Sequence, residues 1–273
     1  MQNVRIYQLY FRPEHRGFLN PLFTPYDNTA NKAPNMREYP LLKECYKLAV
    51  ADGLTHWGGV SWNYKFKFND RVDADNEIFL RHIAKNPGYD TYFFNPFTNH
   101  AAAVWNVWEQ GQWCHPHIVT IMEHLLPLMG ESVEILTMPQ TNGSIFWGSM
   151  CIGNKQFWDR YIDFADRYVS SIDKLPPYVK HLHNSSAAYV DGGINYFSFI
   201  QERLMSSWLA TSGLKIMPWH AAHENVEPVV EELNNLKVSG DWNQWLHIRK
   251  QYIDMIYPGY KIDWGSRWHK LIS

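Results

Sequence analysis

The sequence predicts an α/β fold with a mostly parallel central sheet flanked by helices and a helical C-terminal region. Two observations support this prediction. Short runs of β-branched and aromatic residues recur along the chain, and between them lie longer segments with apolar residues three and four positions apart. Strands that alternate with helices form parallel sheets covered by helices. With 273 residues, of which 45 % are hydrophobic, the chain can build a sizeable core.

The N-terminal third contains three predicted strands and two predicted helices. The run VRIYQLYF at 4–11 predicts the first strand. A long polar segment rich in Pro, Asn and Asp follows, and we expect a loop there, of a length that is often functional. Helical spacing at 38–52 and 74–86 predicts two helices, and THWGGVSW at 55–62 and DTYFF at 90–94 predict the second and third strands.

The rest of the chain is predicted to be mainly helical. Helical spacing and glycine or proline stops predict helices over 99–112, 117–129, 155–173, 195–213, 225–237 and 241–256. Runs of apolar residues predict strands over 133–138, 144–153 and 214–219. We expect residues 221–273 to form a helical extension packed on the same domain as residues 1–220.

Composition and charge exclude several classes of protein. The net charge is −2 and no basic stripe is visible, so we expect no nucleic-acid partner. No stretch approaches the ~20 apolar residues of a transmembrane helix. Three cysteines without CxxC spacing argue against a disulfide framework and favour a reducing compartment. We therefore expect a cytoplasmic protein, free or resting on a membrane surface.

The predicted sheet also indicates where a ligand would bind. Ligands of parallel sheets bind at the carboxyl ends of the strands, which places Phe11, Trp62–Lys65 and Asn95–Phe97 around one crevice. No GxGxxG follows the first strand and no GxxxxGK[ST] occurs, so the dinucleotide-binding and P-loop classes lack their motifs. Aromatic residues make up 16 % of the chain; they indicate either a large aromatic core or surfaces on which sugar rings stack.

Residues 87–117 gather an acid, amides, large rings and imidazoles. Asp90 and Asn95 flank the third predicted strand; Asp90 is a candidate ligand for a divalent metal or a ribose hydroxyl, or else a turn residue. Glu109 lies between Trp105 and Trp108. Desolvation by these rings would raise its pKa and make it a general base, unless it is a surface acid of a helix.

Three further groups are candidates for chemistry. The pairs His115-x-His117 and His181-x-His183 would each lie on one face of a strand, a spacing that suits zinc. Asp191 precedes two glycines, which permit close approach of the backbone to a ligand. Arg203 is suited to neutralising a phosphate, or it forms a structural salt bridge with Glu202.

Four segments, in this order, resemble a known group of enzymes: YDNTANKAPNMREYPLLKECYKLA, LTHWGGVSWNYKFK, SIFWGSMCIGNKQFWDRYIDF and FSFIQERLMSSWLA. The group comprises small glycosyltransferases with a compact GT-A-like fold, found in bacterial polysaccharide clusters and some large viruses. The resemblance spans most of residues 4–215. It implies a catalytic domain over residues 1–220 that transfers a sugar from a nucleoside-diphosphate donor to a growing glycan of a polysaccharide, lipopolysaccharide or glycoprotein.

The resemblance and the residue patterns together give a predicted site. Asp191 and then Glu109 are the candidate bases. The predicted donor-binding residues are Tyr26, Asp27, Asn28, Lys65, Asp90, Asn95 and Arg203, and the predicted acceptor-binding residues are Trp62, Trp105, Trp108 and Glu202. Most such enzymes bind Mn²⁺ or Mg²⁺ through Asp-x-Asp, whereas the third strand here reads DTYFFN. A metal-free variant would use Lys65, Lys67 or Arg203 against the diphosphate, and Asp90 is the metal candidate otherwise.

Two other functions stay open on the sequence. The histidine pairs would suit a metal-dependent hydrolase built on His115, His117, His181 and His183. The aromatic content would suit a carbohydrate-binding protein without chemistry, although such modules are more often all-β than α/β. Nucleotide binding separates the glycosyltransferase from both.

Overall fold

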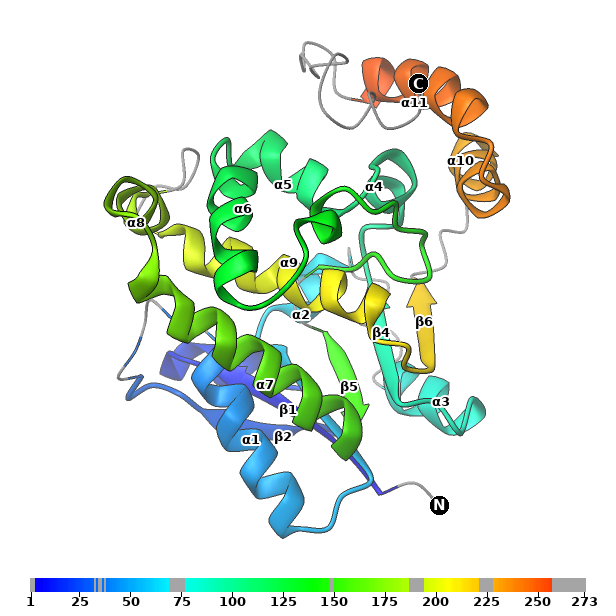
Figure 1. Cartoon of the computed structure of the whole chain (residues 1–273). Helices are drawn as coiled ribbons and strands as arrows, with labels where there is room; N and C mark the ends of the chain where they lie inside the picture. The colour runs from blue at the N-terminus through cyan, green and yellow to red at the C-terminus, as the bar shows by residue number, and fades with distance from the viewer. Residues whose placement is uncertain are drawn as a thin grey trace.

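A computed structural model describes residues 3–31, 33, 36, 38–68, 77–147, 150–186, 194–220 and 228–256. It shows an α/β protein with a six-stranded sheet between helices (Figure 1). The strands are β1 (Val4–Tyr10), β2 (Thr24–Asp27), β3 (His56–Ser61), β4 (Thr91–Asn95), β5 (Cys151–Asn154) and β6 (Ile216–His220). The predicted α/β class is confirmed.

The sheet has the order β2-β1-β3-β5-β4-β6 and is mixed. β1 pairs in parallel with β2 and β3, and β4 pairs in parallel with β6. β5 lies between β3 and β4 and is antiparallel to both. Five strands therefore point in one direction, and their carboxyl ends share one edge of the sheet.

The helices account for most of the remaining chain. The α-helices are α1 (Tyr39–Ala51), α2 (Tyr64–Lys67), α3 (Ile78–Lys85), α4 (Thr98–Ala103), α5 (Val107–Cys114), α6 (Ile118–Leu128), α7 (Lys155–Ser171), α8 (Pro177–Asn184), α9 (Tyr196–Thr211), α10 (Pro228–Ser239) and α11 (Trp242–Ile256). Short 3₁₀ helices are η1 (Pro13–Phe18), η3 (Val133–Leu136) and η4 (Ile172–Lys174). Among the residues that the structure describes, no helix is both long and apolar enough to cross a lipid bilayer.

Alternating side chains of the strands separate two hydrophobic cores. On one face, Trp57 and Phe93 join the larger core with side chains of α1, α5, α6, α7 and α9. On the other face, Tyr92 and Phe94 join a smaller core with α2 and α3, where Phe79 stacks on Phe94 at 3.9 Å between ring centroids. Because successive side chains of a strand point to opposite faces, the sheet binds helices on both sides. The molecule therefore has three layers, with the sheet between two layers of helices.

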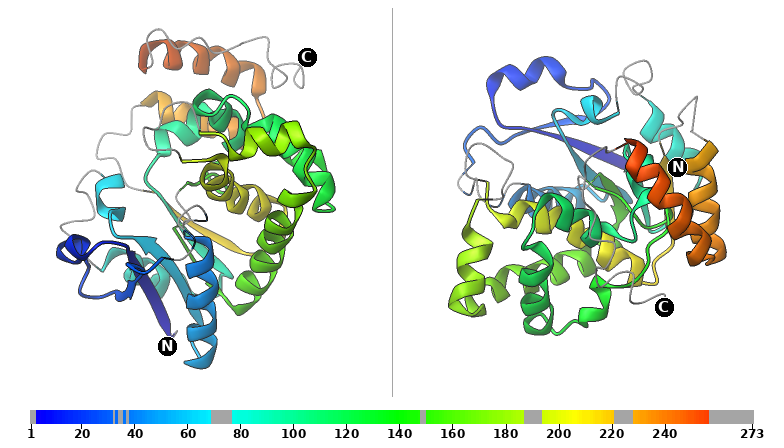
Figure 2. Two further views of the ribbon diagram at one scale, coloured as in Figure 1. Left: turned by 90° about the vertical axis from the view of Figure 1, so that its left-hand side faces the viewer. Right: turned by 90° about the horizontal axis from the view of Figure 1, so that it is seen from above.

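The C-terminal helices α10 and α11 lie at the end of the molecule farthest from the start of β1 (Figures 1 and 2). They pack on α4, and Leu233, Trp245 and Ile253 join the larger core. The indole Nε1 of Trp245 donates to the carbonyl of Ala102 at 3.1 Å. The described part of the C-terminal extension, residues 228–256, is therefore continuous with the main core.

Several predicted elements differ from the structure. The polar segment predicted as a loop contains β2, a short, largely polar edge strand. The strand predicted over 133–138 is wrong, because Ser132 caps a 3₁₀ turn there. The strand predicted over 144–153 is limited to β5. The helix predicted over 99–112 is divided into α4 and α5, because the Asn106 side chain accepts backbone N–H bonds that start a new helix.

Candidate functional site

A cavity of about 480 Å³ opens at the carboxyl ends of β1 and β2. Phe11 follows β1 and Asn28 follows β2, while α1, α2 and α9 supply the other walls. The lining combines three kinds of group: the charged side chains Glu38, Glu202 and Lys67; the polar side chains Asn28, Thr29, Asn31, Ser198 and Gln201; and the rings of Phe11, Tyr39 and Phe199. Leu41, Leu42 and Ile194 complete it. The position agrees with the rule that parallel sheets bind ligands at this edge.

The end of β2 is held in place by Asp27. Its carboxylate accepts hydrogen bonds from the backbone N–H of Thr29 at 2.9 Å and from the hydroxyl of Tyr10 at 2.7 Å. Arg16 forms an ion pair with it at 3.2 Å. These donors, above all the Thr29 N–H, hold the pKa of Asp27 far below its usual range. Asp27 stays ionised and fixes the turn that presents Asn28 to the cavity.

The helix α9 forms one wall with three polar side chains on one face. Ser198, Gln201 and Glu202 are spaced i, i+3 and i+4, so they lie together on the helix surface. The amide Nε2 of Gln201 donates to the Tyr161 hydroxyl at 2.8 Å. Neither Oε1 of Gln201 nor Oγ of Ser198 has a hydrogen-bond partner among the described residues, and both atoms are buried. We call Ser198, Gln201 and Glu202 the α9 wall.

A series of aromatic side chains leads from the cavity to the protein surface. The ring of Phe11, a cavity residue, packs edge-on against His15 at 5.0 Å between centroids, and His15 stacks on Trp62 at 3.8 Å. Trp62 in turn contacts Phe18 and Phe66. The rings of Phe18 and Phe66 are 44 % and 54 % exposed. We call these five residues the aromatic row; exposed clusters of this kind commonly mark binding surfaces.

The structure brings some predicted site residues to the cavity and leaves others nearby. Asn28 and Glu202 line the cavity, and Asp27 supports the turn beside it. Trp62 lies in the aromatic row. Tyr26 is half-buried and packs edge-on against Tyr7. Lys65 belongs to α2, and the lysine of that helix that lines the cavity is Lys67.

Asp90 and Asn95 hold loops in place. Asp90 precedes β4 and so lies at the opposite edge of the sheet from the cavity. Its carboxylate accepts from Nδ2 of Asn154 and from the backbone N–H of Lys215, both at 2.9 Å. The buried Asn95 side chain donates to the carbonyl of Ile145 at 3.0 Å. The predicted donor and metal roles of Asp90, and the donor role of Asn95, have no support in this arrangement.

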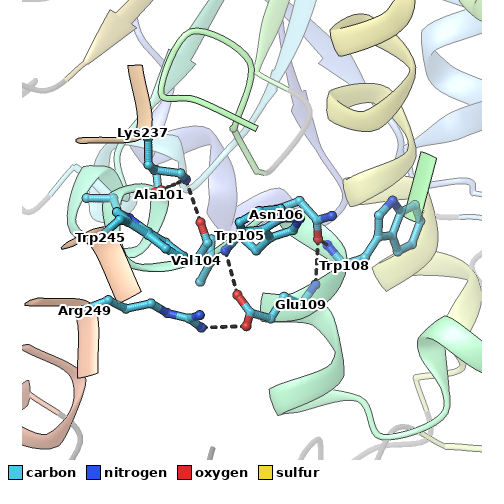
Figure 3. A network of polar contacts seen from close by, with 10 residues as sticks. Ala101, Val104, Trp105, Asn106, Trp108, Glu109, Lys237, Trp245 and Arg249 are labelled. Atoms are coloured by element: carbon cyan, nitrogen blue, oxygen red, sulfur yellow. Dashed lines mark hydrogen bonds and ion pairs between the residues drawn. The ribbon is translucent and has the colours of Figure 1, made fainter. Parts of the chain in front are cut away.

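Glu109 belongs to a buried network (Figure 3). Its side chain is 2 % exposed and pairs with Arg249 of α11 at 2.6 Å, while its second oxygen accepts the backbone N–H of Trp105 at 2.6 Å. Trp105 and Trp108 are core residues, 4 % and 0 % exposed. A carboxylate paired with an arginine in the core is not a free base, and rings this buried offer no face to a sugar. These three residues take no part in the site proposed below.

Arg203 has the structural role that the sequence left open. It is 3 % exposed and donates to the backbone carbonyls of Val107 and Phe199 and to the side chain of Gln110. Its distance to Glu202 is 3.9 Å. Arg203 therefore joins α9 to α5 and supports the α9 wall from behind. It does not line the cavity.

The histidine pairs do not lie on strands as predicted. His115 and His117 occupy the junction of α5 and α6, and His181 and His183 lie in α8. His115 stacks on Phe199, and burial together with the nearby Arg203 charge lowers its pKa to about 3. His183 is buried and contacts the Tyr168 hydroxyl at 3.0 Å. No group of three or more possible metal ligands occurs among the described residues.

The cavity contains residues that the sequence did not predict, and one predicted residue is not described by the structure. Asp191, the first candidate base, lies outside the described residues. Glu38, Asn31, Ser198 and Gln201 were not predicted, although the i and i+3 spacing of the last two, beside Glu202, was a usable signal. Comparisons with protein-family models, with curated proteins and with solved structures found no match.

Proposed function

We propose that this protein is a glycosyltransferase of the GT-A-like kind, which binds a nucleoside-diphosphate sugar in the cavity and transfers the sugar to a glycan. The observation that supports this most directly is the composition of the cavity. It joins carboxylates and amides, which bind hydroxyl groups, with a lysine and aromatic rings at the carboxyl ends of parallel strands. The aromatic row beside it offers stacking surfaces for an acceptor.

Transfer requires stabilisation of the departing nucleoside diphosphate. Lys67 is the cationic side chain among the described lining residues and is suited to this role. The described carboxylates do not gather into a metal-binding cluster, so we derive no step through Mn²⁺ or Mg²⁺. Metal dependence is instead one arm of the test below.

Attack by the acceptor hydroxyl requires a carboxylate base in an inverting enzyme. Asp191 stays our first candidate; it lies three residues before Ile194, which lines the cavity. Glu202, in the α9 wall, is the second candidate and takes the place of Glu109, whose carboxylate is paired with Arg249. An Asp191→Asn variant should bind the donor normally and lose transfer. Unchanged transfer in Asp191→Asn and in Glu202→Gln would contradict both assignments.

A thermal-shift and turnover experiment tests the proposal. UDP, GDP, CDP and their common sugar conjugates are screened with and without Mn²⁺, and donor cleavage is then measured. We expect one nucleotide family to raise the melting temperature. Lys67→Met should weaken that response, whereas Lys85→Met, on the exposed face of α3, should not. No response to any nucleotide would overturn the proposal, and binding without cleavage in the presence of glycan acceptors would indicate a binding protein.

A further inference from the structure

The α9 wall presents an unusual surface because its hydrogen-bonding atoms are fixed in direction. The Gln201 side chain is 6 % exposed, and its Nε2 is bound to Tyr161, which is fully inside the core. Burial raises the pKa of the Tyr161 hydroxyl strongly, so that it stays neutral. One N–H of this amide is engaged by Tyr161, while the buried Oε1 of Gln201 has no partner among the described residues.

The other members of the wall add acceptors to the same face. Glu202 contributes a carboxylate, and the buried Ser198 Oγ likewise has no partner among the described residues. Buried polar atoms of this kind are unfavourable unless a ligand or a water molecule forms hydrogen bonds with them. A phosphate carries only acceptor oxygens and negative charge, so the Glu202 carboxylate and the Gln201 oxygen disfavour it, although the Ser198 hydroxyl can also donate. A sugar ring carries several adjacent O–H donors and matches the wall.

The lysine of the cavity lies on a different element. Lys67 projects from α2, which follows β3, whereas the wall belongs to α9. The cation that favours an anion and the acceptors that favour hydroxyl groups therefore come from separate elements of the cavity wall. A ligand with both features, a diphosphate at one end and a hydroxylated ring at the other, would occupy both parts at once.

We propose that the α9 wall is a hydroxyl-binding surface that holds the adjacent hydroxyls of one sugar ring of the ligand through Ser198, Gln201 and Glu202, with the diphosphate directed towards Lys67. The proposal rests on the function proposed above. Two rings of a nucleotide sugar carry this chemistry, the ribose and the transferred sugar. Comparison of the nucleoside diphosphate with its sugar conjugate distinguishes them, because only the conjugate contains the second ring.

A pair of serines on α9 provides a matched test. Ser198 and Ser207 both have buried Oγ atoms without a partner among the described residues, but only Ser198 lines the cavity. Binding of UDP, UDP-glucose, GDP and GDP-mannose is measured by calorimetry for Ser198→Ala, Ser207→Ala and Gln201→Met. We expect Ser198→Ala and Gln201→Met to weaken binding by roughly three- to tenfold, the effect of one lost hydrogen bond, and Ser207→Ala to have no effect.

The outcomes separate the possible failures. Weakening of both the diphosphate and its conjugate assigns the wall to the ribose, and weakening of the conjugate alone assigns it to the transferred sugar. Normal binding of every nucleotide by Ser198→Ala and Gln201→Met would contradict the proposed role of the α9 wall and leave the proposed function intact. If no nucleotide binds, the proposed function fails and free glucose, galactose and mannose become the probes. If a free sugar binds and Ser198→Ala weakens its binding, the α9 wall keeps its proposed hydroxyl-binding role. If none of the three sugars binds, that role is refuted.

Discussion

Two buried polar side chains, Glu109 and Gln201, show how differently such groups are used in this protein. Glu109 has its charge matched by Arg249 and its second oxygen occupied by the Trp105 N–H. Gln201 lines the cavity, with its nitrogen held by Tyr161 and its buried oxygen without a partner among the described residues. The first arrangement is complete within the protein and so stabilises the fold. The second is incomplete within the described residues, and we propose that a ligand completes it.

Substitution of Glu109 should therefore affect stability and not chemistry. In Glu109→Gln the buried Arg249 loses its ion pair with the Glu109 carboxylate, and we expect a loss of about 3 kcal/mol in the free energy of unfolding, measured in urea. A double variant, Glu109→Gln with Arg249→Met, also removes the buried guanidinium and should recover part of this loss. Full stability of Glu109→Gln combined with lost transfer would instead make Glu109 catalytic.

The aromatic row leads to a prediction for the acceptor. In Trp62→Ala the link between the cavity and the exposed rings of Phe18 and Phe66 is broken. Since an aromatic contact contributes about 1 kcal/mol, we expect roughly a fivefold rise in the acceptor KM. Donor hydrolysis in water should be unchanged. Tyr178→Ala, which removes an exposed ring on α8, is the control; an equal effect of both variants would refute a local acceptor surface.

Among individual residues, the sequence identified part of the candidate site. The resemblance pointed to Asn28 and Glu202, which line the cavity, and to Asp27 beside it. Glu109 could not be placed correctly, because a carboxylate among tryptophans has the same local pattern in a core and in an active site. Its partner lies 140 residues away in α11, and no local pattern shows such a contact.

The sequence predicted whether most segments form helices or strands, but it did not predict how the strands pair in the sheet. Strong periodicity located β1, β3, β4, α7 and α9 to within a few residues. β2 is four residues long and largely polar, so its only strand signal is its position beside β1. The antiparallel direction of β5 also had no local signal, because a strand has the same alternation of side chains in either direction.

The insertion of β5 depends on a close approach at Gly58. A Cβ atom at this position would lie 1.9 Å from the carbonyl oxygen of Cys151, whereas at Gly59 the nearest atom would be 3.4 Å away. We expect Gly58→Ala to separate β3 from β5 and to prevent folding or lower the melting temperature strongly. Gly59→Ala should be tolerated much better. Similar melting temperatures for the two variants would contradict this account of the β3–β5 contact.

In the whole molecule, the C-terminal helices are joined to the main domain through the end of α4. Lys237 of α10 is buried and its Nζ donates to the carbonyls of Ala101 at 2.9 Å and Val104 at 2.6 Å, the carbonyls that α4 leaves unpaired at its end (Figure 3). Trp245 and Arg249 of α11 bind the same region. Attachment of this extension therefore depends on a lysine that has little contact with solvent.

Burial makes this attachment sensitive to pH. Desolvation, with a smaller effect of the Arg249 charge, lowers the pKa of Lys237 from 10.5 to about 7. Between these two values the unfolded chain binds more protons than the folded protein, so stability increases with pH in this window and is lost as the pH falls towards 7. The maximum slope is about 1.4 kcal/mol per pH unit.

Replacement of Lys237 should remove this dependence. In Lys237→Met the two carbonyls lose their donor, so the variant is less stable than the wild type at high pH, and the difference should shrink as the pH is lowered from 9 to 6.5 because the wild type alone must then charge a buried amine. Melting temperatures of both proteins across this range measure the difference. Lys85→Met, an exposed lysine change on α3, should show a constant difference. A difference for Lys237→Met that is equally constant would mean that the amine keeps its proton in the folded protein, and that the C-terminal helices are held by a permanent charge at the end of α4.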